Sequence, residues 1–260
     1  MVGHQNKIEI FKKLADKDKL FHAYLFFGES QVGKFLFTVS MANYLECGIF
    51  EEPRKILEEA LIIAPDIKNK IGIESARKLR DFLFQSPILS KKRIVIIRDA
   101  ENLTFEAQNA LLKIVEDNPP FSLIIFISSD ENSLLPALSS RLQKIYFSRV
   151  AEFEIKKYLE NMGVKKEDKK KIAEAVKNSF GRPGMAIDMI QNQKPKTKNF
   201  KIDDVVENEK INEFFENKLI ELRDSGYKDI DSAKEILKRL SLIKMFNVNK
   251  KLQLKTLLNN

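Results

Sequence analysis

Four short apolar runs stand out in the first half of the chain, each bounded by turn-forming or charged residues. They cover residues 22–28, 60–67, 93–99 and 122–129, and a weaker run covers 144–147. Helical patterns lie between several of them. Continuous apolar strands that alternate with helices are typical of a parallel sheet covered by helices on both faces. The pattern therefore predicts an α/β domain over residues 1–148.

The clearest helical pattern is TFEAQNALLKIVED, residues 104–117. Thr104 is suited to cap its first turn, because a Thr side chain can accept a hydrogen bond from a free backbone N–H. The apolar residues of this segment recur on one face of a helix: Ala107, Ala110, Leu111, Ile114 and Val115. The sequence NPP follows at 118–120 and ends the helix, since a residue before proline avoids the helical conformation.

The strand pattern ends near residue 148. Residues 149–192 contain short helical patterns, with a glycine-rich turn in SFGRPGMAIDMI before the last of them. Residues 193–204 have the composition of a linker. The pattern over 205–260 is again that of amphipathic helices, so we expect a small helical domain, a linker and a short helical C-terminal domain.

Composition narrows the class of protein. The chain has 260 residues, 43% hydrophobic and 32% charged, as in soluble globular proteins of two or three small domains. Its one cysteine, Cys47, excludes an internal disulfide framework and a multi-cysteine zinc site, and we expect it to be buried in a reducing compartment. Without a signal peptide pattern or the roughly 18 apolar residues of a membrane span, we expect a cytoplasmic protein with no membrane contact.

The net charge of +8 comes largely from two lysine-rich segments, GVKKEDKKKI and NQKPKTKNFK. These segments fit solvated faces and a linker. They also fit a loose attraction to the phosphate backbone of a nucleic acid, because basic surface displaces its counterions. Composition alone does not choose between the two interpretations.

Residues 28–35, GESQVGKF, are nearly a phosphate-binding loop. Gly28, Gly33 and Lys34 have the spacing G-x-x-x-x-G-K, but Phe35 follows where such loops carry the Ser or Thr that holds Mg²⁺. A strand before the loop and a helix after it would point backbone N–H groups at an anion. The simpler alternative is a tight strand-to-helix turn with an exposed lysine.

Residues 93–147, which include NALLKIVEDNPP and LLPALSSR, closely resemble the core of the bacterial clamp-loader AAA+ ATPases of DNA polymerase III. HAYLFFG, IAPDI and the closing NVNKKLQLKTLL also follow the order of that family. The resemblance implies an α/β fold of the AAA+ P-loop type. It implies a RecA-like domain over 1–148, a helical lid domain over 149–192 and a short helical collar for oligomerisation over 205–260.

Three departures from the family fall at the nucleotide site. In an active member the strand IVIIRDAE would present an Asp that supports Mg²⁺ and then a Glu that polarises water, where this chain has Arg98 and Asp99. Phe35 replaces the hydroxyl ligand, and Met185 stands where nucleotide-sensing members carry an Arg. The resemblance thus implies no intrinsic ATPase and a degenerate loop, with Gly28, Gly33 and Lys34 empty or holding only an anion.

We further hypothesise that the Arg98 guanidinium lies near the vacated metal position and supplies charge there, since a fixed cation would repel Mg²⁺. Related clamp loaders carry a four-cysteine zinc module that this chain lacks, so we expect no zinc and no other cofactor. Phe35 and Phe37 are expected to pack into the core. His4 and His22 are interpreted as structural.

LSSRLQ, residues 138–143, resembles the Ser-Arg-Cys motif of the family, with Ser140 and Arg141 retained and Leu142 in place of Cys. In these rings that Arg is a finger that reaches the ATP of a neighbouring subunit and offsets transition-state charge. The resemblance implies this role for Arg141. The alternative is an ordinary surface ion pair.

A chain that keeps the finger and loses the metal site looks like the delta-prime type of subunit, a largely rigid ring member. The resemblance then implies gamma/tau motor subunits and a delta subunit as partners, with the sliding clamp and primed DNA reached through the assembled complex. Two alternatives stay open. One is an active clamp-loader or helicase-loader ATPase that uses Asp99 and Glu101 for Mg²⁺, and the other is a non-ring, nucleic-acid-binding AAA+-like scaffold.

Overall fold

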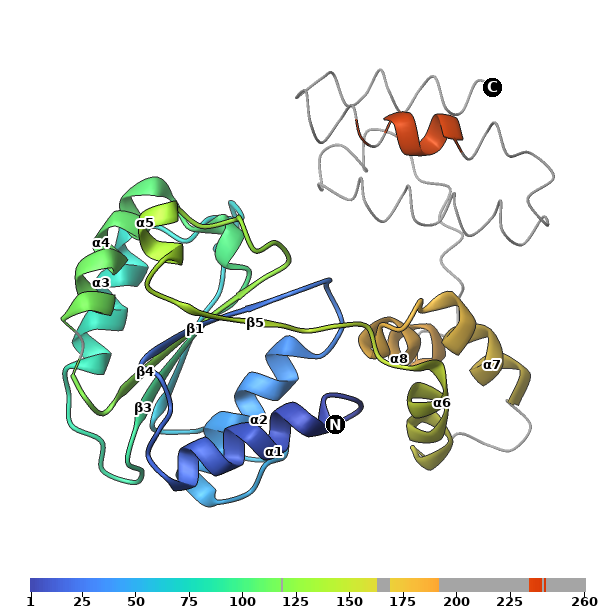
Figure 1. Cartoon of the computed structure of the whole chain (residues 1–260), viewed down its shortest axis with the longest axis horizontal. Coiled ribbons are helices and arrows are strands. Elements are labelled where there is room, and N and C mark those ends of the chain that lie inside the picture. Colours follow the sequence, from blue (N-terminus) through green and yellow to red (C-terminus); the bar gives the residue numbers. More distant parts are fainter. Residues whose placement is uncertain (118, 163–168, 192–233, 240, 242–260) are drawn as a thin grey trace. The chain divides into compact units, whose positions relative to one another are not determined.

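The computed structural model describes residues 1–117, 119–162, 169–191, 234–239 and 241 (Figure 1). The chain forms two compact units, Met1–Gln193 and Lys194–Asn260. In the second unit only residues 234–239 and 241 are described, and they are helical. The predicted linker, and all of the predicted collar except these residues, lie outside the described residues.

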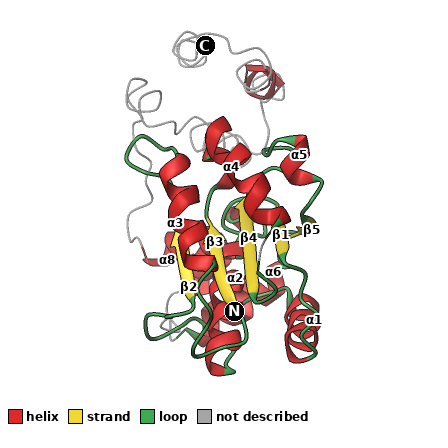
Figure 2. Cartoon of the chain, turned by 90° about the vertical axis from the view of Figure 1, so that its left-hand side faces the viewer, coloured by secondary structure: helices red, strands yellow, loops and turns green. Residues whose placement is uncertain are grey.

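The first unit is built on a sheet of five parallel strands (Figure 2). Their order across the sheet is β2-β3-β4-β1-β5, and their bounds are β1 Ala23–Phe27, β2 Ala60–Ile63, β3 Arg93–Ile97, β4 Ser122–Ser128 and β5 Gln143–Tyr146. Each strand lies within, or within one residue of, an apolar run of the sequence. The central β3 and β4 are buried along their whole length, as a parallel sheet covered on both faces requires.

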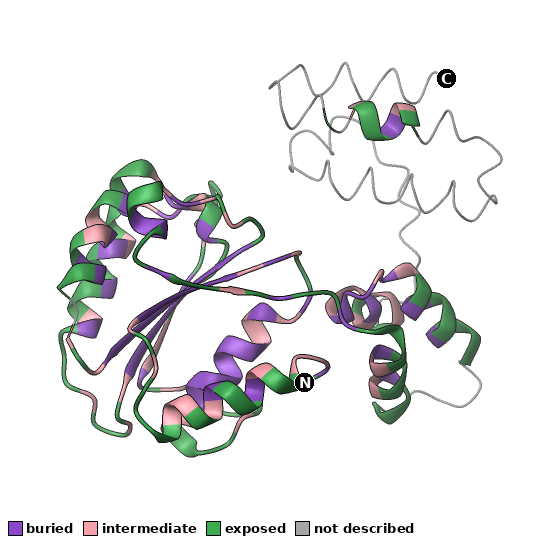
Figure 3. Ribbon diagram, viewed as in Figure 1, coloured by how far each residue is buried: buried purple, intermediate pink, exposed green. Residues whose placement is uncertain are grey.

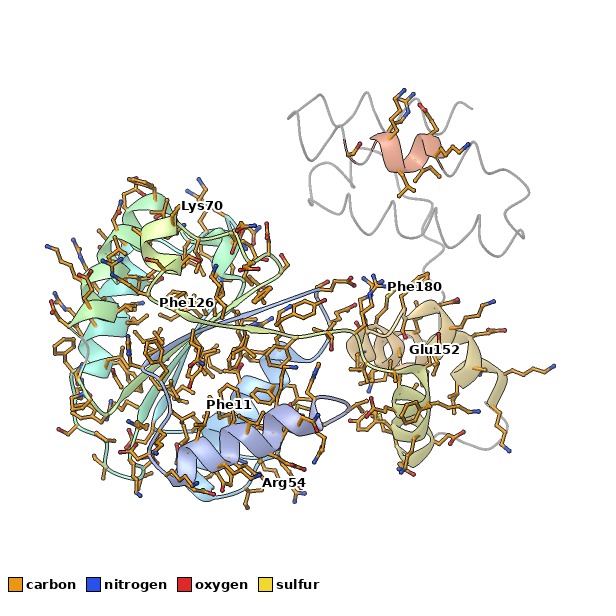
Figure 4. All side chains as sticks on the ribbon, in the orientation of Figure 1. Phe11, Arg54, Lys70, Phe126, Glu152 and Phe180 are labelled. Carbon is orange, nitrogen blue, oxygen red and sulfur yellow. The ribbon has the colours of Figure 1, made fainter. Side chains whose placement is uncertain are left out.

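Helices cover both faces of this sheet (Figure 3). On one face lie α1 (Gln5–Asp16) and α2 (Lys34–Cys47), and on the other lie α3 (Ile73–Leu83), α4 (Phe105–Glu116) and α5 (Pro136–Ser139). A short 3₁₀ helix, η1 (Ala100–Asn102), follows β3. Each face has its own apolar cluster: Phe11 of α1 belongs to one and Phe126 of β4 to the other (Figure 4). The predicted α/β class and helix layers are confirmed.

Helix α4 forms where its sequence pattern predicts a helix. The Thr104 side chain accepts a hydrogen bond from the Ala107 N–H at 3.2 Å, which satisfies one of the free donors of the first turn. Leu111, Ile114 and Val115 are buried against the sheet. The helix ends at Glu116, just before the predicted NPP stop.

Residues after β5 form three short helices, α6 (Glu152–Asn161), α7 (Lys169–Asn178) and α8 (Pro183–Gln191), as the sequence predicts. They share a small apolar cluster to which Val2, from the N-terminal segment, also belongs. We refer to α6–α8 as the lid. The turn before α8 contains Gly181, whose φ of +76° is one that a side chain disfavours.

One sequence-based expectation about packing is wrong. Cys47 is exposed rather than buried, because it is the last residue of α2 and lies beyond the part of the helix that packs on the sheet. Gly48 then ends the helix in a left-handed conformation. Among the described helices, none combines the length and the apolar character that crossing a membrane would need.

Candidate functional site

The loop between β1 and α2 depends on its two glycines. Gly28 has a φ of +134°, and a Cβ there would lie 2.3 Å from the backbone oxygen of Phe147. Gly33 has a φ of +102° with open space around it, so its requirement is conformational rather than steric. Together they give the sharp turn that places the first residues of α2 at the edge of a cavity.

Lys34 turns back onto this loop. Its ammonium donates hydrogen bonds to the backbone oxygen of Gly28 and, at 2.6 Å, to that of Glu29. The residue is only 7% exposed, and this burial lowers the Lys34 pKa to about 8, although the carboxylates of Glu101, Asp99 and Glu29 act in the opposite direction. Lys34 is therefore buried, and the alternative of a tight turn with an exposed lysine is wrong in that respect.

A cavity of about 380 Å³ lies beside the loop. Ser30, Gln31, Gly33, Lys34, Phe35 and Leu36 line one side of it, and the residues after β3 and at the end of β4 line another. The rest of the lining comes from the N-terminal segment and from the lid. The carboxyl ends of parallel strands are the usual place for a ligand in such folds.

Phe35 and Arg98 meet in this cavity. The guanidinium carbon of Arg98 lies 4.4 Å from the centroid of the Phe35 ring, a cation–π arrangement. Phe37 is fully buried, as expected, whereas Phe35 is only partly buried because it sits in the first turn of α2, at the cavity wall. The two residues that the family resemblance aligns with the hydroxyl and the acid of active members are thus packed on each other.

Asp99 and Glu101 line the same cavity. Asp99 follows β3 in a left-handed conformation with a φ of +49°, and it is exposed. Glu101 accepts a hydrogen bond from the Ser129 hydroxyl at 2.8 Å, which ties it to the end of β4. Within the described ranges, no three His, Cys, Asp or Glu residues come together in a way that could hold a metal ion.

Met185 does not line the cavity, although the family resemblance aligns it with a nucleotide-sensing Arg. Its sulfur accepts a hydrogen bond at 2.9 Å from Arg182, which is 6% exposed. The cavity instead receives Pro183, Gly184 and Ile187 from α8. The lid contributes backbone and apolar surface there.

The sequence does not reveal the contacts between the loop and its surroundings. Arg149 forms an ion pair with Glu29, with nitrogen–oxygen distances of 2.7 and 3.0 Å. Gly184 donates its backbone N–H to the Gln31 oxygen at 3.0 Å. These partners lie more than 100 positions apart in the chain, so no local pattern could have revealed them.

His4 contributes a third contact to the loop. Its Nε2 lies 3.0 Å from the Val32 oxygen, and its ring packs edge-on against Phe147. Burial is the largest influence on the His4 pKa and lowers it from the usual value. This environment agrees with the structural interpretation of His4.

Arg141 lies away from the cavity, after α5, and its side chain is 40% exposed. Its Nε donates to Glu116 Oε1 at 2.6 Å and its Nη1 to the Ala137 oxygen at 2.5 Å. Ser140 donates its hydroxyl to the same Ala137 oxygen at 3.0 Å. Arg141 thus forms a surface ion pair in the free chain and is accessible to a second molecule.

The sequence of this chain is similar to those of known proteins. The family described as "DNA polymerase III, delta subunit" matches residues 3–151. The gamma/tau subunit of DNA polymerase III from Mycobacterium tuberculosis is 30% identical over 154 residues, 54% of this chain and 27% of that protein. The same subunit from Mycoplasma genitalium is 28% identical over 209 residues, 74% of this chain and 35% of that protein. The chain therefore spans about a quarter to a third of the length of these relatives.

Solved structures agree on the fold. A gamma subunit-related protein of Thermotoga maritima superposes with a TM-score of 0.56 at 21% identity, over 97% of each chain. The RuvB Holliday junction branch migration motor of Thermotoga maritima gives a TM-score of 0.52 at 17% identity, over 95% of this chain and 78% of that one. Since the family match covers more than half of the 260 residues, this chain belongs to the DNA polymerase III delta subunit family and is a clamp-loader member of the AAA+ class.

Proposed function

We propose that this chain is a delta-prime-type subunit of a bacterial DNA polymerase III clamp loader. In this role it does not hydrolyse ATP. It supplies Arg141 to the nucleotide of a neighbouring gamma/tau-type subunit while the ring loads the sliding clamp onto primed DNA. The observation that supports the proposal is the stack of Arg98 on Phe35, because the family resemblance aligns these two residues with the acid and the hydroxyl that support Mg²⁺ in active members.

The physical reason is the dependence of phosphoryl transfer on metal. In this class of enzyme Mg²⁺ bridges the β- and γ-phosphates and neutralises developing charge. A guanidinium at that position opposes a second cation. Lys34, which would contact the phosphates in an active loop, donates two of its three hydrogen bonds to the backbone oxygens of Gly28 and Glu29. Each of these features favours a site that does not turn over ATP.

A second candidate function is that of an ATPase motor. Two observations favour it: the curated relatives include gamma/tau subunits, and Asp99 and Glu101 both line the cavity next to Lys34. This candidate needs Mg²⁺ to bind through these two carboxylates despite Arg98. Turnover by the isolated chain separates the two candidates.

The test combines two measurements. The purified chain is first assayed for Mg²⁺-dependent ATPase, alone and as the Lys34→Ala variant, and we expect no turnover that Lys34 controls. The chain is then combined with the gamma/tau-type and delta subunits of the same organism, and ATPase and clamp loading on primed DNA are compared with and without it. Turnover that Lys34→Ala abolishes would favour the motor, and failure to sediment with the other subunits would favour a non-ring scaffold.

A further inference from the structure

The partner of Arg141 is a residue in an unusual electrostatic position. Glu116 is the last residue of α4; its Oε1 accepts a hydrogen bond from Arg141 Nε at 2.6 Å and forms an ion pair with Nη2 at 2.5 Å. The C-terminal end of a helix carries partial negative charge, so a carboxylate there is disfavoured. The positive charge of Arg141 stabilises the Glu116 carboxylate at this end of the helix.

The contact leaves part of the guanidinium available. Arginine has five N–H donors in a fixed fork. Glu116 accepts the hydrogen bond of Nε, and Nη1 donates to the Ala137 oxygen and lies 3.4 Å from the Ser140 hydroxyl. Nη2 lies in the ion pair with Glu116 but donates no hydrogen bond among the described residues, and the side chain remains 40% exposed.

Both partners are attached to rigid parts of the domain. Ile114 and Val115 of α4 are buried directly before Glu116, and Leu138 and Leu142 are buried on either side of Arg141 in the sequence. The backbone at both ends of the ion pair is therefore fixed by the core. The remaining freedom is that of the Arg141 side chain itself.

We propose that Glu116 is a positioning residue for Arg141. By accepting the Nε hydrogen bond and pairing with the guanidinium charge, it keeps the side chain ordered, with Nη2 still able to donate to the phosphate of a neighbouring subunit's nucleotide. Ordering a long side chain on contact has an entropic cost, and a side chain already held in place avoids much of it. This inference rests on the proposed function, because it needs Arg141 to act in trans.

The test uses Glu116→Ala and Glu116→Gln in the reconstituted ring, with kcat and KM for ATP measured at saturating clamp and primed DNA. We expect Glu116→Ala to lower kcat about two- to tenfold with little change in KM, the factor that losing one ordered side chain implies. Glu116→Gln should lower it less, because the amide oxygen still accepts a hydrogen bond. Glu131→Gln is the matched control, since Glu131 forms an exposed ion pair with Lys144 at 3.0 Å.

The double variant Glu116→Ala/Arg141→Ala should be no slower than Arg141→Ala, because Glu116 acts only through Arg141. An unchanged or higher kcat in Glu116→Ala, with assembly and melting temperature preserved, would overturn the inference while Arg141→Ala still lowers kcat. A double variant slower than Arg141→Ala would overturn it as well. If Arg141→Ala itself has no effect, the proposed function fails and the positioning role fails with it.

Discussion

The guanidinium of Arg98 stacks on the ring of Phe35, with 4.4 Å between the guanidinium carbon and the ring centroid. The two residues are 63 positions apart, one directly after β3 and the other in the first turn of α2. They meet because both lie at the carboxyl edge of the same parallel sheet. Because the two side chains are in contact, we expect the effect of mutating either one on ligand binding to depend on the identity of the other.

This coupling predicts the result of restoring the expected metal ligands. Phe35→Thr alone leaves the Arg98 cation in the cavity, and Arg98→Asp alone leaves no hydroxyl, so neither should bind Mg²⁺–ATP measurably better than the unaltered chain. The double variant Phe35→Thr/Arg98→Asp removes the repulsion and supplies both ligands. We expect Mg²⁺-dependent nucleotide binding to appear only there, as measured by calorimetry with and without EDTA.

The matched control is Phe37→Leu, which alters the same helix inside the core and leaves the cavity as it is. Tight Mg²⁺–ATP binding by the unaltered chain would contradict the prediction, and so would equal gains from each single substitution.

His4 predicts a dependence of stability on pH. Its folded-state pKa lies below the unfolded value because of burial, so below about pH 6.5 the unfolded chain binds a proton that the folded chain resists. The free energy of unfolding should fall as the pH drops from 7.5 to 5.5, and above that range His4 should contribute no pH dependence. His4→Gln keeps a donor for the Val32 oxygen and does not titrate, so it should show a shallower slope in urea unfolding.

His22, whose pKa burial also lowers, would remain in that variant and give a residual slope of the same sign. Parallel slopes for the unaltered chain and His4→Gln would show that His4 is protonated as easily in the folded chain as in the unfolded one.

The strands and helices of the first unit could be predicted because their signals are local. Apolar runs marked β1 to β5, and Thr104 with the NPP sequence marked both ends of α4. The family resemblance also indicated Phe35 and Arg98 as altered ligands. It could not indicate that they stack, because that depends on side-chain conformations set by packing.

Other features could not be predicted from the sequence, because they also depend on tertiary packing. The ion pair of Glu29 with Arg149 joins residues 120 positions apart. Residue type predicts that Cys47 is buried, whereas its exposure is decided by where α2 leaves the sheet. Met185 was aligned with a nucleotide-site residue, but the turn of α8 directs its sulfur to Arg182.

A buried ion pair predicts a large effect on stability. Arg93 Nε lies 3.1 Å from Glu59 Oε2, and the two side chains are 9% and 4% exposed. Glu59 also accepts the backbone N–H of Ile88 and Leu89, at 2.5 and 2.9 Å, so it connects β2 to the segment that precedes β3. Glu59→Ala leaves the Arg93 charge buried without its partner, which should lower the free energy of unfolding by about 3–5 kcal/mol.

Glu131→Ala, which breaks the exposed pair with Lys144, should lower the free energy of unfolding by only about 0–1 kcal/mol. Urea unfolding of the two variants side by side gives the comparison. Equal losses would mean that the burial of Glu59 and Arg93 has no energetic consequence.

Arg141→Ala should separate stability from activity. The residue is exposed and its ion pair with Glu116 lies on the surface, so its loss should change the free energy of unfolding by no more than about 1 kcal/mol.

In the reconstituted ring the same variant should lower ATPase and clamp loading, because a neighbouring nucleotide loses a charge that stabilises its transition state. An arginine finger supplied in trans is worth about 10³–10⁵ in rate where one site depends on it. The ring as a whole should lose less, since its other sites keep their own fingers. Arg141→Lys keeps the charge but not the planar fork, and it should recover only part of the rate. Wild-type rates from an assembled ring that carries Arg141→Ala would leave Arg141 as a surface ion pair and contradict the finger role that the delta-prime proposal assigns to it.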